Sequence, residues 1–88
     1  MKSRQPHPLQ PYIAQVLDQI RVNKNISKAE IARRSGITDR AVRLFFNSNK
    51  TNITMSVFLH LCDALDISGE EVMRVALYNH SRFAHLQP

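Results

Sequence analysis

The sequence contains very few residues that interrupt a helix. It has two glycines and four prolines in 88 residues. Three of the prolines, Pro6, Pro8 and Pro11, fall in the first eleven residues, so the rest of the chain is almost free of helix breakers. Because glycine and proline are the residues that most disfavour a helix interior, this scarcity predicts an all-α fold.

Cysteine is also scarce, and Cys62 is the only one in the sequence. A single cysteine excludes an internal disulfide, which argues against a secreted, disulfide-stapled mini-protein and favours a reducing compartment. No apolar run approaches the ~18–20 residues of a membrane span, and residues 1–6 lack the apolar stretch of a signal peptide. We therefore expect a cytoplasmic protein with no membrane partner.

Features of catalytic and metal sites are missing as well. There is no nucleophile–base pattern, no glycine-rich phosphate loop and no paired acidic cluster, so we expect no enzyme activity, no catalytic residue and no cofactor. The residues His60, Cys62, His80 and His85 match no zinc spacing, and Cys62 lies on an apolar stripe, so we expect no metal site.

A chain of 88 residues accommodates one small domain. We expect a flexible arm at 1–10, a single domain at 11–84 and a frayed tail at 85–88. This organisation leaves no room for a separate ligand-sensing domain.

Charge is distributed unevenly along the sequence. Residues 1–52 contain ten Lys or Arg and three Asp or Glu, whereas residues 53–88 contain two and four. A basic half of this kind suggests a polyanionic partner such as nucleic acid, although a solvated surface would show the same excess.

Apolar periodicity and capping residues predict five helices. In the second, the Ser27 hydroxyl is expected to accept from the Glu30 N–H while the Glu30 side chain returns to the Ser27 N–H. Gly36 is expected to end this helix in the left-handed conformation. Thr38, Thr54 and Ser68 are expected to cap the next three. The expected helices run over about 11–22, 27–35, 38–46, 54–65 and 68–83.

The fourth expected helix has one apolar stripe, at spacings of 0, +3, +4, +7 and +10. We expect Cys62, on this stripe, to be a buried structural residue. The members of the stripe are Met55, Phe58, Leu59, Cys62 and Leu65.

Two short helices joined by Gly36, Ile37 and Thr38 form a helix-turn-helix pattern at about 27–46. The segment 26–38, ISKAEIARRSGIT, resembles the motif of the Cro and lambda-repressor type of DNA-binding domain, also called XRE-type. The resemblance continues through 52–72 and covers about 13–75 in all.

This resemblance implies a compact five-helix, lambda-repressor-like domain whose third helix enters the major groove of double-stranded DNA. It implies DNA contacts by Thr38, Asp39, Arg40, Ala41, Arg43 and Leu44, and backbone contacts by Lys28, Asn47 and Lys50. Arg33 and Arg34 either contact phosphate or are solvated, and Lys2 and Arg4 either grip DNA or form a disordered basic terminus.

Three positions depart from the family pattern. Asp39 places a negative charge where a neutral or basic reader is common, and either accepts from a cytosine amino group or only caps the helix. Phe46 stands where the family usually has Glu, and either packs within the protein or contacts a partner. Asp66 replaces a helix-ending glycine, and aspartate tolerates the left-handed conformation better than most residues.

The resemblance implies a sequence-specific transcriptional regulator, most often a repressor, that binds a pseudo-palindromic operator as a homodimer. The expected dimer interface consists of Met73, Leu77, Tyr78 and Phe83. A protein-binding module on the same fold, such as a toxin-neutralising antitoxin or an antagonist of another regulator, is the alternative. Asp39 and the altered Phe46 region motivate that alternative.

Overall fold

The structure is a computed structural model that describes residues 7–48 and 52–84, without the side chains of Ser48, Phe83 and Ala84. Within these ranges the chain forms five α-helices and no strand, which confirms the all-α fold expected from the sequence. The helices are α1 (Gln10–Asn23), α2 (Lys28–Ser35), α3 (Asp39–Ser48), α4 (Met55–Ala64) and α5 (Gly69–Ala84).

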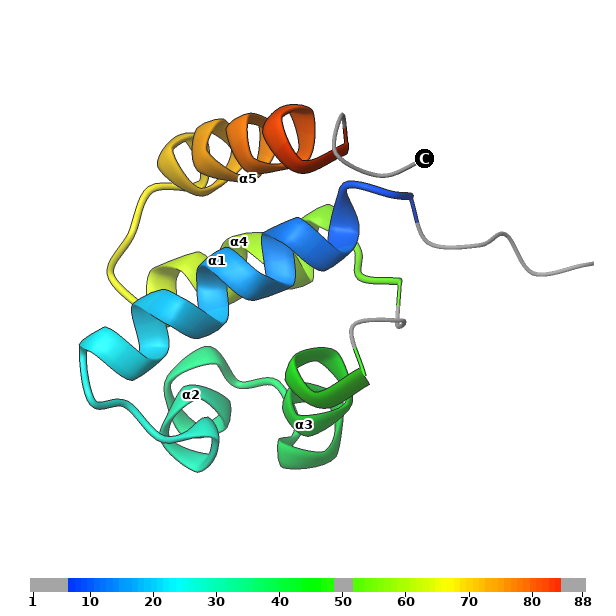
Figure 1. The fold of residues 1–88 in the computed structure, drawn as a ribbon. Coiled ribbons are helices and arrows are strands. Elements are labelled where there is room, and N and C mark those ends of the chain that lie inside the picture. Colours follow the sequence, from blue (N-terminus) through cyan, green and yellow to red (C-terminus); the bar gives the residue numbers. More distant parts are fainter. Residues whose placement is uncertain (1–6, 49–51, 85–88) are drawn as a thin grey trace, which may run out of the picture.

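The helices are arranged around α1 and α4, as Figure 1 shows. Both of these helices pack against α5 on one side, and on the other side α1 packs on α3 and α4 packs on α2. The α1–α5 contact is the most extensive and includes the Tyr12 and His80 rings, which meet edge to face with centroids 5.3 Å apart. As a result, α2 and α3 lie together on the side of the domain away from α5 (Figure 1).

A single apolar core draws on all five helices. Leu17, Ile31, Leu65 and Val72 are fully buried, one each from α1, α2, the end of α4 and α5. Phe45 from α3 is 2% exposed and completes this core. Because each helix contributes a large side chain to one cluster, packing rather than helix propensity holds the helices in place.

The helix N-termini follow the predicted caps. Each capping hydroxyl accepts a hydrogen bond from the backbone N–H three residues later, at 3.0 to 3.2 Å, which satisfies a donor that has no partner within the helix. The capping residues are Ser27, Thr38, Thr54 and Ser68.

Three residues have a positive φ, at the breaks between helices. Gly36 ends α2 with φ 76°, and Asp66 follows α4 with φ 54°, so both adopt the left-handed conformation predicted for them. Asn25, in the break between α1 and α2, has φ 57°. Asparagine and aspartate tolerate this region better than most residues other than glycine.

Cys62 is buried as predicted, at 2% exposure, but the apolar stripe of α4 is not buried along its whole length. Met55 is 69% exposed and Leu59 is 48% exposed, whereas Leu61 is 1% exposed. The reason is that α4 lies between α2 and α5, so the buried side is centred on Phe58, Leu61 and Leu65. Periodicity locates an apolar face but not the edges of the neighbours that cover it.

The first helix begins earlier than expected. Gln10, assigned from the sequence to the N-terminal arm, is the first residue of α1 and is 9% exposed. Pro11 follows within the first turn, where its missing N–H costs no intrahelical hydrogen bond. Across the described residues, none of the helices has the length and apolar character needed to cross a membrane.

Candidate nucleic-acid interface

The third helix separates an apolar face from a polar face. Val42, Phe45 and Phe46 are buried at 1%, 2% and 8% exposure. The residues predicted to face DNA are all exposed on the remaining surface of α3 or at its start: Thr38, Asp39, Arg40, Ala41, Arg43, Leu44 and Asn47. At 100° per residue, the centre of this exposed face falls on Arg40, Arg43, Leu44 and Asn47, while Ala41 lies at its edge.

An open hollow brings most of this face together. Its lining residues are Asp39, Arg40, Arg43, Leu44 and Asn47. Two guanidinium groups, one carboxylate, one amide and one branched apolar side chain are therefore presented side by side. This is a suitable mixture for base edges, which offer hydrogen-bond donors, acceptors and the thymine methyl group.

Asp39 and Arg43 form an ion pair on the exposed face. The Arg43 Nε–H donates to Asp39 Oδ2 at 2.6 Å, across one helical turn. Both side chains remain about half exposed, at 54% and 51%. Asp39 thus has a partner in its own helix, in addition to its favourable place in the first turn next to the positive end of the helix dipole.

Lys28 and Asn47 connect the start of α2 with the end of α3. Lys28 Nζ donates to Asn47 Oδ1 at 2.5 Å. Both residues were predicted to contact the DNA backbone, and the fold places them in direct contact although they are 19 residues apart. An ammonium group and an amide at one position are well suited to hold a phosphate oxygen.

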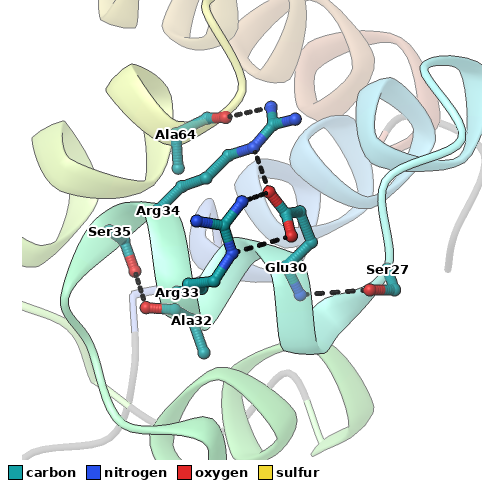
Figure 2. A network of polar contacts seen from close by, with 7 residues as sticks. All are labelled: Ser27, Glu30, Ala32, Arg33, Arg34, Ser35 and Ala64. Atoms are coloured by element: carbon teal, nitrogen blue, oxygen red, sulfur yellow. Dashed lines mark hydrogen bonds and ion pairs between the residues drawn. The ribbon is translucent and has the colours of Figure 1, made fainter.

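The two arginines of α2 are engaged within the protein. Figure 2 shows the Glu30 carboxylate between Arg33 and Arg34, and Glu30 Oε2 accepts from Arg34 Nε at 2.8 Å. Arg34 also donates to the Ala64 carbonyl at 3.3 Å, which ties α2 to the end of α4. The second half of the expected capping box is therefore wrong, because the Glu30 carboxylate accepts from these arginines rather than from the Ser27 N–H.

The same network lowers the pKa of Glu30. Hydrogen bonds from Arg33 and then Arg34 hold the pKa of Glu30 below its ordinary value of 4.5, because both favour the ionised carboxylate. Arg33 remains mostly exposed, with 73% of its side chain accessible. Its guanidinium is thus exposed to solvent and paired with the Glu30 carboxylate at the same time.

Phe46 packs within the protein. It is 8% exposed, its ring lies edge to face with Phe45 at 5.1 Å, and the Arg21 guanidinium lies 5.8 Å from its centroid. Arg21 is itself fixed by Asp18 at 2.9 Å and by the Ile26 carbonyl at 3.0 Å. Of the two alternatives left open by the sequence, internal packing is the observed one.

The other basic residues of positions 1–52 are of two kinds: three lie outside the described residues, and Lys24 has a role within the fold. Lys50 and the basic residues of the N-terminal arm, Lys2 and Arg4, lie outside the described residues. Nothing in the sequence indicated a role for Lys24, yet its Nζ donates to the Leu65 carbonyl at 2.6 Å and so caps the end of α4. Its sequence neighbours carry no signal for a contact 41 residues away.

The residues expected at a dimer interface are only partly exposed. On α5, Leu77 is 52% exposed and Tyr78 is 61% exposed, whereas Met73 is partly buried against the core. The side chain of Phe83 lies outside the described residues. Exposed apolar side chains on the outermost helix are compatible with contact to another chain.

Of the residues weighed as metal ligands, His85 lies outside the described residues, and His60, Cys62 and His80 do not form a cluster. Cys62 is 2% exposed in the core, where burial and then the neighbouring Asp63 raise the pKa of its thiol. His80 packs on Tyr12, and His60 is exposed on α4. In the part of the chain that the structure describes, no three His, Cys, Asp or Glu side chains come together in a way that could hold a metal ion.

Comparison with known proteins agrees with this geometry. The family model of the Cro/C1-type HTH DNA-binding domain matches residues 16–76, from within α1 to the middle of α5. No curated protein and no solved structure gave a significant match. Because the matched segment covers more than half of the chain and includes α2, the turn and α3, this protein belongs to the Cro/C1-type helix-turn-helix DNA-binding family.

Proposed function

We propose that the protein is a sequence-specific transcriptional regulator, acting as a repressor, that binds a pseudo-palindromic operator as a homodimer in the cytoplasm. The observation that supports this most directly is the exposed face of α3, on a helix held from behind by Val42, Phe45 and Phe46. A helix fixed in this way can enter the major groove without losing its own packing.

The side chains divide into two roles. Arg40 and Arg43 are proposed to contact base edges, since arginine donates two parallel hydrogen bonds to guanine, and Leu44 is proposed to contact a thymine methyl group. Lys28, Asn47 and Lys50 are proposed to contact phosphates. Phosphate contacts fix the register of the helix on the duplex, and base contacts select the sequence.

The dimer is proposed to form through α5. Leu77 and Tyr78 expose apolar surface there, and α5 lies across the domain from α3 (Figure 1). Pairing through α5 would leave both copies of α3 free for DNA. Two half-sites would then lie about one helical turn apart, ~34 Å.

Selection of bound DNA from a random pool tests this function. The expected result is an enriched pseudo-palindrome, whose binding weakens steeply as salt increases because neutralised phosphates release counterions. Replacing Arg40 or Arg43 with alanine should cost roughly 1–3 kcal/mol of operator binding and relax the selected sequence. If both variants kept the wild-type affinity, α3 would not be the reading element.

The alternative function, a protein-binding module, was first suggested by Asp39 and the Phe46 region. In the structure, other residues support it better. Phe46 is buried, so it offers no surface to a partner. Met55 and Leu59 are instead exposed on α4 and could contact a toxin or another regulator. Failure to recover any DNA motif at moderate salt, together with a stable complex with the product of a neighbouring toxin or regulator gene, would favour this function.

A further inference from the structure

We propose that Asp39 determines operator specificity indirectly, as a positioning residue that holds the Arg43 guanidinium in the orientation in which it reads guanine. This inference rests on the proposed function, because it assumes that α3 enters the major groove. It states that the Arg43 side chain is already oriented for one base pair before the protein binds DNA.

The hydrogen bond between the two residues leaves the required donors available. Asp39 Oδ2 accepts from Arg43 Nε at 2.6 Å. A guanidinium has five N–H donors, so the four on the two terminal nitrogens remain. Those two nitrogens present the parallel pair of N–H groups that matches the O6 and N7 acceptors of guanine in the major groove. We therefore infer that Arg43 reads guanine.

Holding the guanidinium at Nε also limits what else it can do. A long arginine side chain near DNA is attracted to phosphates as well as to bases, and it loses rotamer freedom when it binds either. The carboxylate one turn earlier restricts Arg43 before DNA arrives and offsets part of its charge. Both effects favour a directional base contact over a phosphate contact. Arg40 has no ion-pair partner among the described residues, so the same helix carries one arginine that a carboxylate holds, Arg43, and one that it does not.

The location of the Asp39–Arg43 ion pair indicates a role in binding rather than in stabilising the fold. Asp39 and Arg43 are each about half exposed and line the same hollow as Arg40, Leu44 and Asn47, at the face proposed to meet DNA. An ion pair with this exposure contributes little to folding because solvent screens it. Direct reading of cytosine by Asp39 is less favoured, since its Oδ2 is already an acceptor for Arg43.

The test compares base preference in four variants of the full chain: D39N, R43A, the double variant D39N/R43A, and E70Q. Asp39→Asn removes one negative charge from α3, and Glu70→Gln removes one from an exposed position on α5. The two variant proteins therefore have the same net charge. Binding of each variant to the selected operator and to its single-base substitutions is measured by fluorescence anisotropy. Circular dichroism confirms that each variant is folded.

The expected result is that R43A abolishes the preference for guanine at one position of each half-site. D39N should lower that preference by about five- to tenfold, the lower part of what a bidentate arginine–guanine contact provides. E70Q should leave it unchanged, and D39N should have no further effect when Arg43 is already alanine. A structural role for Asp39 would change the melting temperature but not the preference at one base.

Three outcomes would overturn the proposal. If D39N kept the full guanine preference, Asp39 would not position Arg43, while the proposed function would stand. If D39N instead lost a preference for cytosine at a position that R43A still selects, Asp39 would read a base directly. If the wild-type protein selected no motif at all, the proposed function would fail, and this inference with it.

Discussion

Lys28 Nζ donates to Asn47 Oδ1 at 2.5 Å, and this contact joins the first residue of α2 to the last full turn of α3. A lysine at the start of a helix faces the positive end of the helix dipole, which disfavours a cation. The amide oxygen of Asn47 partly compensates. A phosphate placed at the same position would compensate more fully, since helix N-termini attract anions.

The first prediction concerns this lysine. Lys28→Ala should weaken binding to all DNA sequences about equally, because it removes a phosphate contact rather than a base contact. The slope of log Kobs against log salt should become less steep by about 1 per protomer. Fluorescence anisotropy titrations at several salt concentrations would measure both quantities.

Arg74→Ala is the matched control for Lys28→Ala. It removes one positive charge from α5, where Arg74 pairs with Glu71 at 2.5 Å. Its salt slope should stay close to that of the wild-type protein. Equal slopes for the two variants would show that Lys28 acts only through net charge.

The second prediction concerns Phe46, which stands where the family usually has Glu. Phe46→Ala should lower the free energy of unfolding by about 3 kcal/mol, because it leaves a cavity beside Phe45 and removes the surface that Arg21 covers. Urea denaturation would measure this loss. Leu44→Ala, at a 45% exposed position of the same helix, should change stability by about 0.5 kcal/mol or less. A stable Phe46→Ala protein would contradict the packing of this ring in the core.

The third prediction concerns the two helix-ending residues in the left-handed conformation, one of which is a glycine, Gly36, and the other an aspartate, Asp66. A Cβ added at Gly36 would meet nothing within 4 Å, so Gly36→Ala should cost only the backbone strain of its φ of 76°, about 1 kcal/mol. Asp66→Gly should stabilise the protein by about 0.5 kcal/mol, because it relieves strain at φ 54°. The hydrogen bonds at this position, from the Asp66 N–H to Asp63 and from Lys24 to the Asp66 carbonyl, use backbone atoms of residue 66 and are retained. Thermal unfolding that moved in the same direction for both variants would contradict this assignment.

The fourth prediction follows from the lowered pKa of Glu30. Because the folded-state pKa lies below the ordinary 4.5, the folded protein favours the ionised carboxylate. Its stabilising contribution is complete above that ordinary value and is lost as pH falls through the lower folded-state pKa. The difference in melting temperature between the wild-type protein and Glu30→Gln should therefore shrink below about pH 4.5. A difference that stayed constant across this range would show that Arg33 and Arg34 do not act through the charge of Glu30.

Local signals were enough to predict the five helices and most of their ends, although α1 begins at Gln10, within the expected arm. The hydroxyl caps at Ser27 and Thr54 and the left-handed residues Gly36 and Asp66 depend only on side chains within a few positions, so they can be read from short segments. The exposed face of α3 was equally predictable, since at 100° per residue Arg40 and Arg43 point to a different side of the helix from the buried Val42. In each case the relevant interaction is completed within a turn or two of the chain.

The partners of the polar side chains were not predictable in the same way. Glu30 was expected to return to the Ser27 N–H, but two arginines of its own helix compete for it, and guanidinium groups are the stronger donors to a carboxylate. The exposure of Met55, on the apolar stripe of α4, also depends on neighbouring helices that are distant in the sequence.

The sequence by itself determined an all-α chain, the position of its helix-turn-helix and the outward direction of the basic residues on α3, because these follow from helix period and capping. Only the tertiary structure decided that Phe46 is a core residue, that Lys24 caps α4, and that Lys28 lies against Asn47. These contacts join residues 19 or more positions apart, or depend on the shape of the space between helices. They are set by how five amphipathic helices fill one core, which no single segment of the sequence specifies.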